Sequence, residues 1–471
     1  MDLANVSGTF ALTSVNASGA DIGINLSSVN PSSGSFAVTG TGGTCTAASP
    51  TCSGGTITGS SDTGVKLTSA KNVSLTRMRL NGSTNFGLNG STVTGLALDT
   101  CVFDGSHGGA VDEGALFVTD WLGTGTISGS EILGGFNDNV RVNNTTGVLD
   151  RLTISGTTIR NSGNNHGLAL YTCLGGGASS CSGVTMKVTV TGSTFTDNSS
   201  NHIDAGSKGL AAMDLVISAN TFQSANTTAS QPFGGAVNAS TDHSSHLTFD
   251  VDGNASTFSR LTAFNFFISN LTTSNASMTG RFRNNQVGLA GTGPGSVSSA
   301  SVQGGGLAVT ATGAAALVMA ITGNTIRNWG GNNAVDLNAG DGGATGPLVD
   351  LTLTGNTVDL ESPTVNQLHG IIANMGTTSG GGVVTACVDI GGAGLANDVA
   401  GGSSVVGGGS EIRFRQRNTS VVRLPGYAGG ATDTTALSTY LAARNTTSGT
   451  ASISSSINTL VSGGAACTQP P

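Results

Sequence analysis

The stretch ITGNTIRNWGGNNAVDLNAG, residues 321–340, decides the fold, because the chain repeats its pattern at many places. Apolar and polar residues alternate at its start, a turn signal follows at Gly323-Asn324, and the alternation returns at Val335–Leu337. A period of two residues is typical of a β-strand with one buried face. LTISGTTIRNSGNNHGLAL at residues 152–170 and VTVTGSTFTDNSSNHIDA at residues 188–205 repeat both the strands and the turn. The sequence therefore predicts a repeat protein built from short strands.

The repeat has a six-residue core with the order apolar, any, small, Asn or small polar, any, apolar. Successive copies begin between 23 residues (Leu75 to Leu98) and 39 residues (Phe282 to Ile321) apart. A second alternating strand follows most cores, and a third often precedes them. A variable period of this size indicates one structural unit repeated with loops of different length. The cores begin at Leu98, Ile127, Ile154, Val190, Ile217, Phe282, Ile321, Leu353 and Ile390, with looser copies at Leu75 and Val251.

Three short strands per repeat, without helical periodicity between them, predict an all-β fold. We expect a right-handed parallel β-helix, a solenoid with about three short strands per coil and a short C-terminal capping helix. Each strand would lie about 4.8 Å from its copy in the next coil, so that equivalent side chains stack. No coil can bury its apolar face alone, because only the neighbouring coils cover it. The repeat alignment places one internal row at Ile132, Ile159, Phe195, Phe222, Ile326 and Val358.

The fourth position of the core falls at a corner of the predicted coil. Asn220, Asn324 and Asn356 occupy it, and Ser or Thr replaces them in other copies. Asparagine tolerates a left-handed backbone, and its amide can hydrogen-bond to the coils on either side. We therefore expect left-handed asparagines that form a ladder at this corner. Cys101 falls at the same position, which predicts an inert thiol.

Three regions are predicted along the chain: irregular N-terminal strands or a cap at residues 1–55, β-helix coils at 56–409, and a C-terminal cap at 410–471. In the last region, SEIRFRQRNTSVVRLPGY at residues 410–427 places arginines in strand alternation. TDTTALSTYLAARN at residues 432–445 begins with a capping signal and has the spacing of a short amphipathic helix. A cap is expected because an open end exposes unpaired strands.

Charge and composition exclude several classes of protein. Charged residues make up 9% of the 471 residues, and the net charge is −8. Nucleic-acid binding needs a basic surface and aromatic side chains for stacking, and the chain has only two Trp and three Tyr. The most apolar stretch, residues 306–323, alternates with Thr and Gly as strands do. We therefore expect neither a nucleic-acid partner nor a membrane-spanning segment.

The chain has seven cysteines, and six of them suggest pairs. Cys45 with Cys52, and Cys173 with Cys181, are close enough in sequence to close small loops, and Cys387 with Cys467 would join the last strands to the tail. Two or three disulfides are expected, which implies an oxidising compartment. A zinc site is the alternative, but the spacings include no C-x₂-C pair.

The core copies, of the form (I/L/V)-x-G-N-x-(I/F/V), resemble those of the right-handed parallel β-helix superfamily. Few lysines and abundant Gly, Ser, Thr and Asn make the chain most similar to bacterial surface β-strand-repeat proteins and autotransporter-type passengers. IRFRQRNTSVVRLPGYAGG followed by LSTYLAARN is similar to the end of β-helical segments in such proteins, and the resemblance covers residues 56–445.

The resemblance implies a secreted or cell-surface structural or adhesive module without catalysis. Its loops, such as 173–181 and 288–306, would bind a cell-surface glycan or protein, or the module would assemble with its own copies. Loops held by a rigid scaffold are where recognition usually takes place. No cofactor is expected, although calcium is left open.

The alternative is a polysaccharide lyase or hydrolase of the same fold, similar to phage tailspikes or pectate lyases. Such hydrolases need clustered carboxylates, and such lyases need acids that hold calcium and a base. The sequence patterns of polygalacturonases are absent, so exposed turn acids are the favoured interpretation. The candidate catalytic acids are Asp104, Asp112, Glu113 and Asp120, with Arg141 and Arg160 one or two coils away.

His166 and His202 precede the second strand of adjacent repeats. They are weak candidates for a metal site or a pH-sensitive pair. Asn139 and Asn333 hold similar places in other repeats, which favours a corner that accepts Asn or His equally. We therefore expect no metal there.

Overall fold

The computed structural model describes the chain outside residues 31, 50, 225–233, 270–274, 292–294, 297–303, 341–344, 362–366, 378–381, 393, 402–408, 450–451 and 459. The described residues form a parallel β-helix with one short helix near the C-terminus, which confirms the predicted fold class. The chain divides into two compact units, Met1–Gly206 with Ala211–Thr221, and Ser207–Leu210 with Phe222–Pro471.

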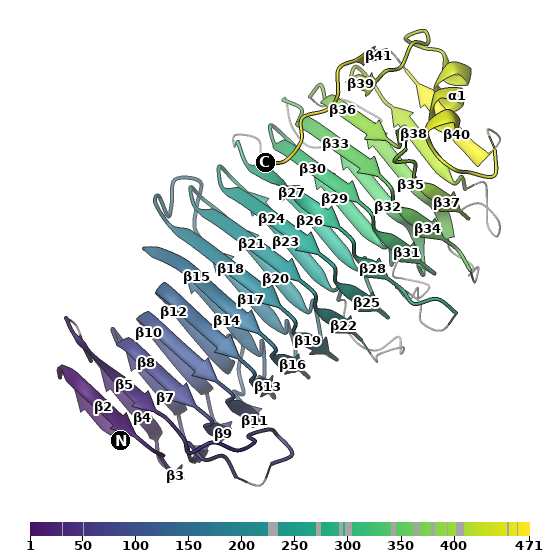
Figure 1. The fold of residues 1–471 in the computed structure, drawn as a ribbon. Coiled ribbons are helices and arrows are strands. Elements are labelled where there is room, and N and C mark those ends of the chain that lie inside the picture. The colour runs from purple at the N-terminus through teal and green to yellow at the C-terminus, as the bar shows by residue number, and fades with distance from the viewer. Residues whose placement is uncertain are drawn as a thin grey trace. The chain divides into compact units, whose positions relative to one another are not determined.

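In the first unit the strands of successive coils stack in three rows, and a full coil contributes one strand to each row. We name the rows A, B and C in chain order (Figure 1). Row A contains β1 (Asp2–Ala4), β4 (Ile22–Ser27), β7 (Thr63–Thr68), the first parts of β10 (Phe86–Asp99) and β12 (Gly114–Ser128), β14 (Val140–Asn144), β17 (Leu168–Thr172) and β20 (Ile203–Ser207). Row B contains β2 (Gly8–Leu12), β5 (Gly34–Val38), β8 (Lys71–Thr76), the second parts of β10 and β12, β15 (Val148–Ser155), β18 (Thr185–Thr191) and β21 (Ala212–Ser218). Row C contains β3 (Ala17–Ser18), β6 (Thr56–Ser60), β9 (Arg79–Ser83), β11 (Val102–His107), β13 (Glu131–Leu133), β16 (Thr158–Arg160) and β19 (Thr194–Thr196), and β22 (Thr221–Gln223) spans the division between the units.

The second unit also has three rows, which we name in the same way. Row A contains β23 (Val237–Asp242), β26 (Phe264–Ser269), β29 (Leu307–Ala311), β32 (Asn332–Ala339), β35 (Gln367–Met375), β38 (Ile412–Gln416) and β40 (Ile453–Ile457). Row B contains β24 (His246–Asp252), β27 (Ser277–Arg283), β30 (Ala316–Thr322), β33 (Leu348–Thr354), β36 (Thr385–Ile390), β39 (Val421–Pro425) and β41 (Leu460–Gly464). Row C contains β25 (Ala255–Thr257), β28 (Gln286–Val287), β31 (Thr325–Arg327), β34 (Thr357–Asp359) and β37 (Asp398–Ala400).

Equivalent side chains stack in row C, where the repeat alignment placed the internal row. Ile132 is opposite Ile159, and Ile159 is opposite Phe195, in parallel register. In the second unit Ile326 is opposite Val358. These side chains, and that of Phe222, are buried. Each strand therefore covers the apolar face of the coil before it, as the fold requires.

A ladder of asparagine side chains runs through the corner between rows B and C of the second unit. Each Nδ2 donates to the Oδ1 of the next asparagine at 2.8–3.0 Å. Asn324 shows the full pattern, because its Nδ2 also donates to the Phe282 carbonyl oxygen at 2.9 Å and its Oδ1 accepts from the Asn285 peptide N–H. The side chains are buried and satisfy one another. The members are Asn254, Asn285, Asn324, Asn356, Asn397 and Asn445.

The expectation that these corner asparagines are themselves left-handed is wrong. The left-handed residue is the one before them, with φ of 65° at Gly323, 65° at Gly355 and 53° at Ala219, whereas Asn324, Asn356 and Asn220 are not among the residues with positive φ. Glycine adopts this conformation at no steric cost, which suits Gly323 and Gly355 to the turn. The asparagine is thereby free to point inward and bond along the stack.

The N-terminal strands pair in parallel with the coils that follow them. β1 pairs with β4, β4 with β7, and β2 with β5. The predicted boundary at residue 55 between irregular strands and coils stays a prediction, as does the boundary at residue 409. The described pairing nevertheless begins at residue 2.

The predicted short helix is α1 (Thr434–Arg444), which lies against β40 (Figure 1). Asp433 caps it by accepting a hydrogen bond from the Ala436 peptide N–H at 2.9 Å. Leu437 and Leu441 are its buried residues. Asn445, the next residue, is the last member of the asparagine ladder, so the ladder connects directly to this helix.

The C-terminal tail runs back across the row-B strands of the second unit (Figure 1). Cys467 is disulfide-bonded to Cys387 on β36. Beyond it, Gln469 Nε2 donates to Thr352 Oγ1 on β33 at 2.7 Å, and Arg281 Nη2 on β27 donates to the Pro470 carbonyl oxygen at 3.1 Å. The tail is therefore fixed at three successive points along its length.

The ladder gives a stability prediction for Asn324→Ala. The substitution leaves several buried donors and acceptors unpaired, at a cost of about 2 kcal/mol or more in the free energy of unfolding. The matched control is Thr325→Ala, whose side chain is partly exposed and faces the other way, with an expected change of about 0.5 kcal/mol or less. The measurement is the urea unfolding midpoint of both variants. Equal midpoints would show that the ladder adds nothing to stability.

Candidate functional site

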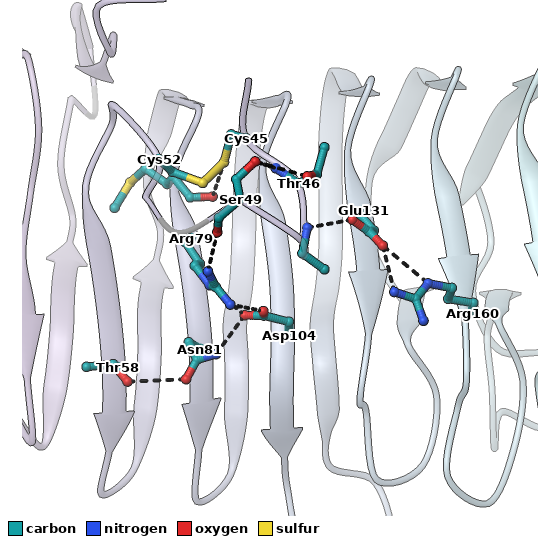
Figure 2. Close-up of polar contacts among 12 residues, drawn as sticks. Cys45, Thr46, Ser49, Cys52, Thr58, Arg79, Asn81, Asp104, Glu131 and Arg160 are labelled. Atoms are coloured by element: carbon teal, nitrogen blue, oxygen red, sulfur yellow. Dashed lines mark hydrogen bonds and ion pairs between the residues drawn. A yellow bond between two sulfur atoms is a disulfide. The ribbon is translucent and has the colours of Figure 1, made fainter. Parts of the chain in front are cut away.

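A disulfide-closed loop lies over the outer face of row C in the first unit (Figure 2). Cys45 and Cys52 form the disulfide, and both are buried against Val102. Two charged side chains of row C anchor the loop. Arg79 Nη1 donates to the Ser49 carbonyl oxygen at 2.7 Å, and Glu131 Oε2 accepts from the Ala47 peptide N–H at 2.7 Å. Bonds to charged partners are stronger than neutral ones, so the loop is well fixed.

Each of the two anchoring side chains is itself held by an opposite charge (Figure 2). Glu131 accepts from Arg160 Nη2 at 2.8 Å. Arg79 Nε donates to Asp104 Oδ1 at 3.1 Å, and Asn81 Nδ2 donates to the same oxygen at 2.9 Å. Asp104, one of the predicted catalytic acids, is buried and orients Arg79 beneath the loop.

Two more of the predicted catalytic acids are bonded to backbone amides. Glu113 Oε2 accepts from the peptide N–H groups of Gly109 and Ala110, both at 2.8 Å, and so closes its own turn. Asp120 is buried, and its Oδ1 accepts from the peptide N–H groups of Thr145 and Thr146 at 2.7 and 2.9 Å. Both carboxylates therefore stabilise corners of the coils.

Asp112, the fourth predicted acid, is exposed and lies beside a shallow cavity of about 220 Å³ on row A. Its carboxylate pairs with Arg141, which also pairs with the buried Asp138 at 2.6 Å and lies 4.8 Å from the centre of the Phe117 ring. Burial raises the pKa of Asp138, and the Arg141 charge opposes that rise. The structure brings Asp112 to Arg141, as the sequence suggested, but among the described residues the four predicted acids share no hydrogen-bond partner.

The two candidate histidines are both largely buried. His202 Nδ1 is 3.0 Å from Asn198 Nδ2, and burial lowers the pKa of His202 to about 3. His166 Nε2 lies 3.7 Å from Asp204 Oδ2. A histidine with a lowered pKa stabilises the fold above its ordinary value of about 6.5, and that contribution is lost as the pH falls towards 3.

Metal-ligand geometry is found at one place among the described residues. Asp350, Cys387 and Cys467 come within 4.8 Å of one another, but the two cysteines are bonded to each other as a disulfide. His166 and His202 do not belong to any such group in the described part of the chain.

All three predicted disulfides form, at Cys45–Cys52, Cys173–Cys181 and Cys387–Cys467. They indicate an oxidising environment. Cys101 is free and buried, and its Sγ lies 3.1 Å from the Leu75 carbonyl oxygen. Burial raises the pKa of Cys101 to about 12, so its thiolate does not form near neutral pH.

Sequence reasoning missed the anchoring roles of Arg79 and Glu131. The available signal was the presence of two charged residues at outward positions of very short strands, in a chain where charge is scarce. It also missed His107, which is buried with its Nδ1 2.8 Å from Ser83 Oγ, and whose pKa burial lowers to about 4. His107 is the last residue of β11, and the centre of its ring lies 6.3 Å from that of Phe103.

Comparison of the chain with models of known protein families, with curated proteins and with solved structures gave no match. Within the described ranges, no helix has the length and apolar character needed to cross a membrane.

The cysteine assignments predict a thiol count. The native protein should show no reactive thiol, the unreduced protein in denaturant should show one, from Cys101, and the reduced and denatured protein should show seven. The measurement is titration with a thiol-specific chromogenic reagent. Three or more thiols in the unreduced, denatured sample would mean that at least one disulfide is absent.

The anchoring of the loop at residues 45–52 predicts the effect of Glu131→Ala. Loss of a hydrogen bond to a charged acceptor should speed hydrogen exchange of the Ala47 amide about tenfold, while the coils keep their protection. Exchange is followed by mass spectrometry of peptides that cover residues 41–54. The control is Glu361→Ala, which removes a similar anchor from Gly291 in the second unit and should leave this loop unchanged.

Proposed function

We propose that the protein is a secreted or cell-surface structural or adhesive module that displays loops from a β-helix scaffold. Its mode of action would be that of bacterial surface β-strand-repeat proteins and autotransporter-type passengers. The observation that carries the proposal is the loop at residues 45–52, described by the structure except at residue 50, which a disulfide closes and two charged side chains hold against row C.

Such a loop is suited to recognition because its conformation is set before a partner arrives. Binding by a flexible loop costs about 0.5–1.5 kcal/mol for each side chain that becomes ordered, and a closed and anchored loop avoids much of that cost. The loop at Cys173–Cys181 is also closed by a disulfide, and it has an exposed Leu174. The other loop named from the sequence, 288–306, lies partly outside the described residues, at 292–294 and 297–303.

The engagement of the acidic side chains supports binding over cleavage of a polysaccharide. Hydrolysis of a glycosidic bond uses two carboxyl groups about 5–10 Å apart that reach the substrate from opposite sides. Here Asp104, Glu113 and Asp120 are each bonded to groups of the chain itself. A calcium-dependent lyase would use the exposed Asp112, so turnover is measured with calcium and without it.

The three disulfides support a location outside the cytoplasm, where such bonds persist. The partner would be a cell-surface glycan or protein, or another copy of the module. No nucleic-acid role is proposed, in keeping with the net charge of −8.

The proposal is tested on glycan and cell-binding arrays, alongside a screen for polysaccharide cleavage. We expect binding without turnover, and at least a tenfold loss of binding in Cys45→Ser/Cys52→Ser, whose loop is no longer closed. The matched comparison is Cys173→Ser/Cys181→Ser, which opens the second loop and shows which of the two makes the contact. Binding unchanged in both variants would contradict loop display. Turnover that Asp112→Asn abolishes would establish the enzyme instead.

A further inference from the structure

A second surface feature lies on the outer face of row A in the second unit. It is a polar groove with a volume of about 570 Å³. Its lining includes Phe267, Thr310, Asn338, Asn374 and Arg417. All five side chains are partly exposed, so the groove is open to solvent at the positions that matter for binding.

Four of these lining residues form one column that crosses the strands, whereas Arg417 follows β38, two residues after Arg415. Phe267 on β26 is opposite Thr310 on β29, Thr310 is opposite Asn338 on β32, and Asn338 is opposite Asn374 on β35. Asn374 is in turn opposite Arg415 on β38. Four steps of strand spacing give the column a length of about 19 Å, which is enough for a short oligomer that lies along it.

The middle of the column consists of connected amides. Asn374 Nδ2 donates to Asn338 Oδ1 at 2.8 Å, and Asn338 Nδ2 donates to Asp336 Oδ1 at 2.8 Å. Arg415 Nη1 lies 3.5 Å from Asn374 Oδ1. These contacts hold the two amides in fixed orientations and use one N–H of each, so that each amide can still donate its second N–H and accept at its oxygen. Fixed amides of this kind suit hydroxyl groups.

One end of the column is strongly cationic. Arg413, Arg415 and Arg417 follow one another at alternate positions of the same strand and its continuation, and their side chains lie on one face. Among the described residues, no carboxylate lies within ion-pair distance of any of the three, whereas Arg283 and Arg327 elsewhere in the unit each pair with two. Burial lowers the pKa of Arg415, as do the charges of the other two arginines.

The charge of Asp336 raises the pKa of Arg415, but among the described residues Asp336 forms no ion pair with any of the three arginines. Its two carboxylate oxygens accept instead from Asn338 and from Asn333, at 2.8 and 3.0 Å. Arg413 donates to Ser454, and its Nε is buried without a hydrogen-bond partner among the described residues. The cluster therefore holds positive charge that the described side chains do not neutralise, in a chain with a net charge of −8.

We propose that this column binds an acidic oligosaccharide. The face of Phe267 packs against one sugar ring, Asn338 and Asn374 bond to hydroxyl groups, and Arg415 and Arg417 pair with a carboxylate or sulfate group. The inference rests on the adhesive role proposed above and names the ligand class of a site that is separate in the chain from the loop at residues 45–52. Guanidinium groups bind planar and tetrahedral anions in this way, with two parallel hydrogen bonds.

The test is calorimetric titration of the full chain with oligosaccharides of matched length. The probes are oligogalacturonate, which carries carboxylates, a sulfated heparin-derived oligosaccharide, and neutral maltooligosaccharide. We expect at least one acidic probe to bind, with an affinity that falls as salt rises, and the neutral probe to bind at least tenfold more weakly. The stronger of the two acidic probes distinguishes a carboxylate from a sulfate ligand.

Three variants locate the site. Arg415→Gln/Arg417→Gln should weaken binding of the acidic probe at least tenfold, and Phe267→Ala should weaken it as well. The control is Arg283→Gln, which removes a partly exposed positive charge from row B and should leave the affinity unchanged. If the double variant does not fold, hydrogen exchange of the unaltered protein decides instead: the probe should protect residues 371–377 and 412–417.

Several results would overturn the inference. They are no binding of either acidic probe, an equal loss in Arg283→Gln, or equal binding of polyglutamate or a single-stranded oligonucleotide, which would show attraction to any polyanion. If cell adhesion persists in Arg415→Gln/Arg417→Gln but is lost in Cys45→Ser/Cys52→Ser, the adhesive function is supported and this site has no part in adhesion. If the acidic probe binds but the protein shows no cell adhesion, the site is supported and the adhesive function is contradicted.

Discussion

The hydrogen bonds between corner asparagines are the constraint on which the second unit depends. Each carboxamide accepts from the coil before it and donates to the coil after it, so a coil can satisfy its neighbours in one register only. A shift by one residue would turn every buried side chain of a strand outward. In the first unit Ser193 and Asn220 make similar contacts at the same corner, at 2.9 Å between the Ser193 peptide nitrogen and Asn220 Oδ1. The buried apolar rows supply the free energy of burial, and the hydrogen bonds at the corner fix the register between coils.

Once register is fixed from inside, the outer face of each strand can vary without cost to the fold. This explains how a chain with so little charge can place its charged groups where they act together. Arg79 and Asp104 come from neighbouring coils, as do Glu131 and Arg160, and both pairs support the same loop. On β38 the pattern is different, because Arg415 has an amide beside it in place of a carboxylate. The scaffold thus presents one surface whose charges are balanced and another whose charge is not.

The sequence alone predicts the features that follow from periodicity. Alternation and repeat spacing predict the parallel coils, the stacking of Ile132 on Ile159, and the short helix, and cysteine spacing predicts the three disulfides.

Features that depend on the exact path of the backbone were not predictable. The left-handed turn is at Gly323, one residue before the asparagine that seemed to require it, since a side chain committed to the ladder cannot also make the turn. The hydrogen bond between Ala47 and Glu131 joins residues that are 84 positions apart in the chain, and no local sequence pattern predicts it. For the same reason the acids near residue 112 read as a cluster in sequence but have separate partners in space.

The disulfide between Cys387 and Cys467 has a mechanical consequence. The two cysteines are 80 residues apart, and the chain between them contains β37, β38, β39, α1, β40 and β41. Tension applied to the chain beyond Cys467 passes through the sulfur–sulfur bond to β36 and bypasses the hydrogen bonds of that whole segment. The last coils are thus excluded from the line of force, and a pull from that side loads a strand in the interior of row B instead of peeling the end of the stack open.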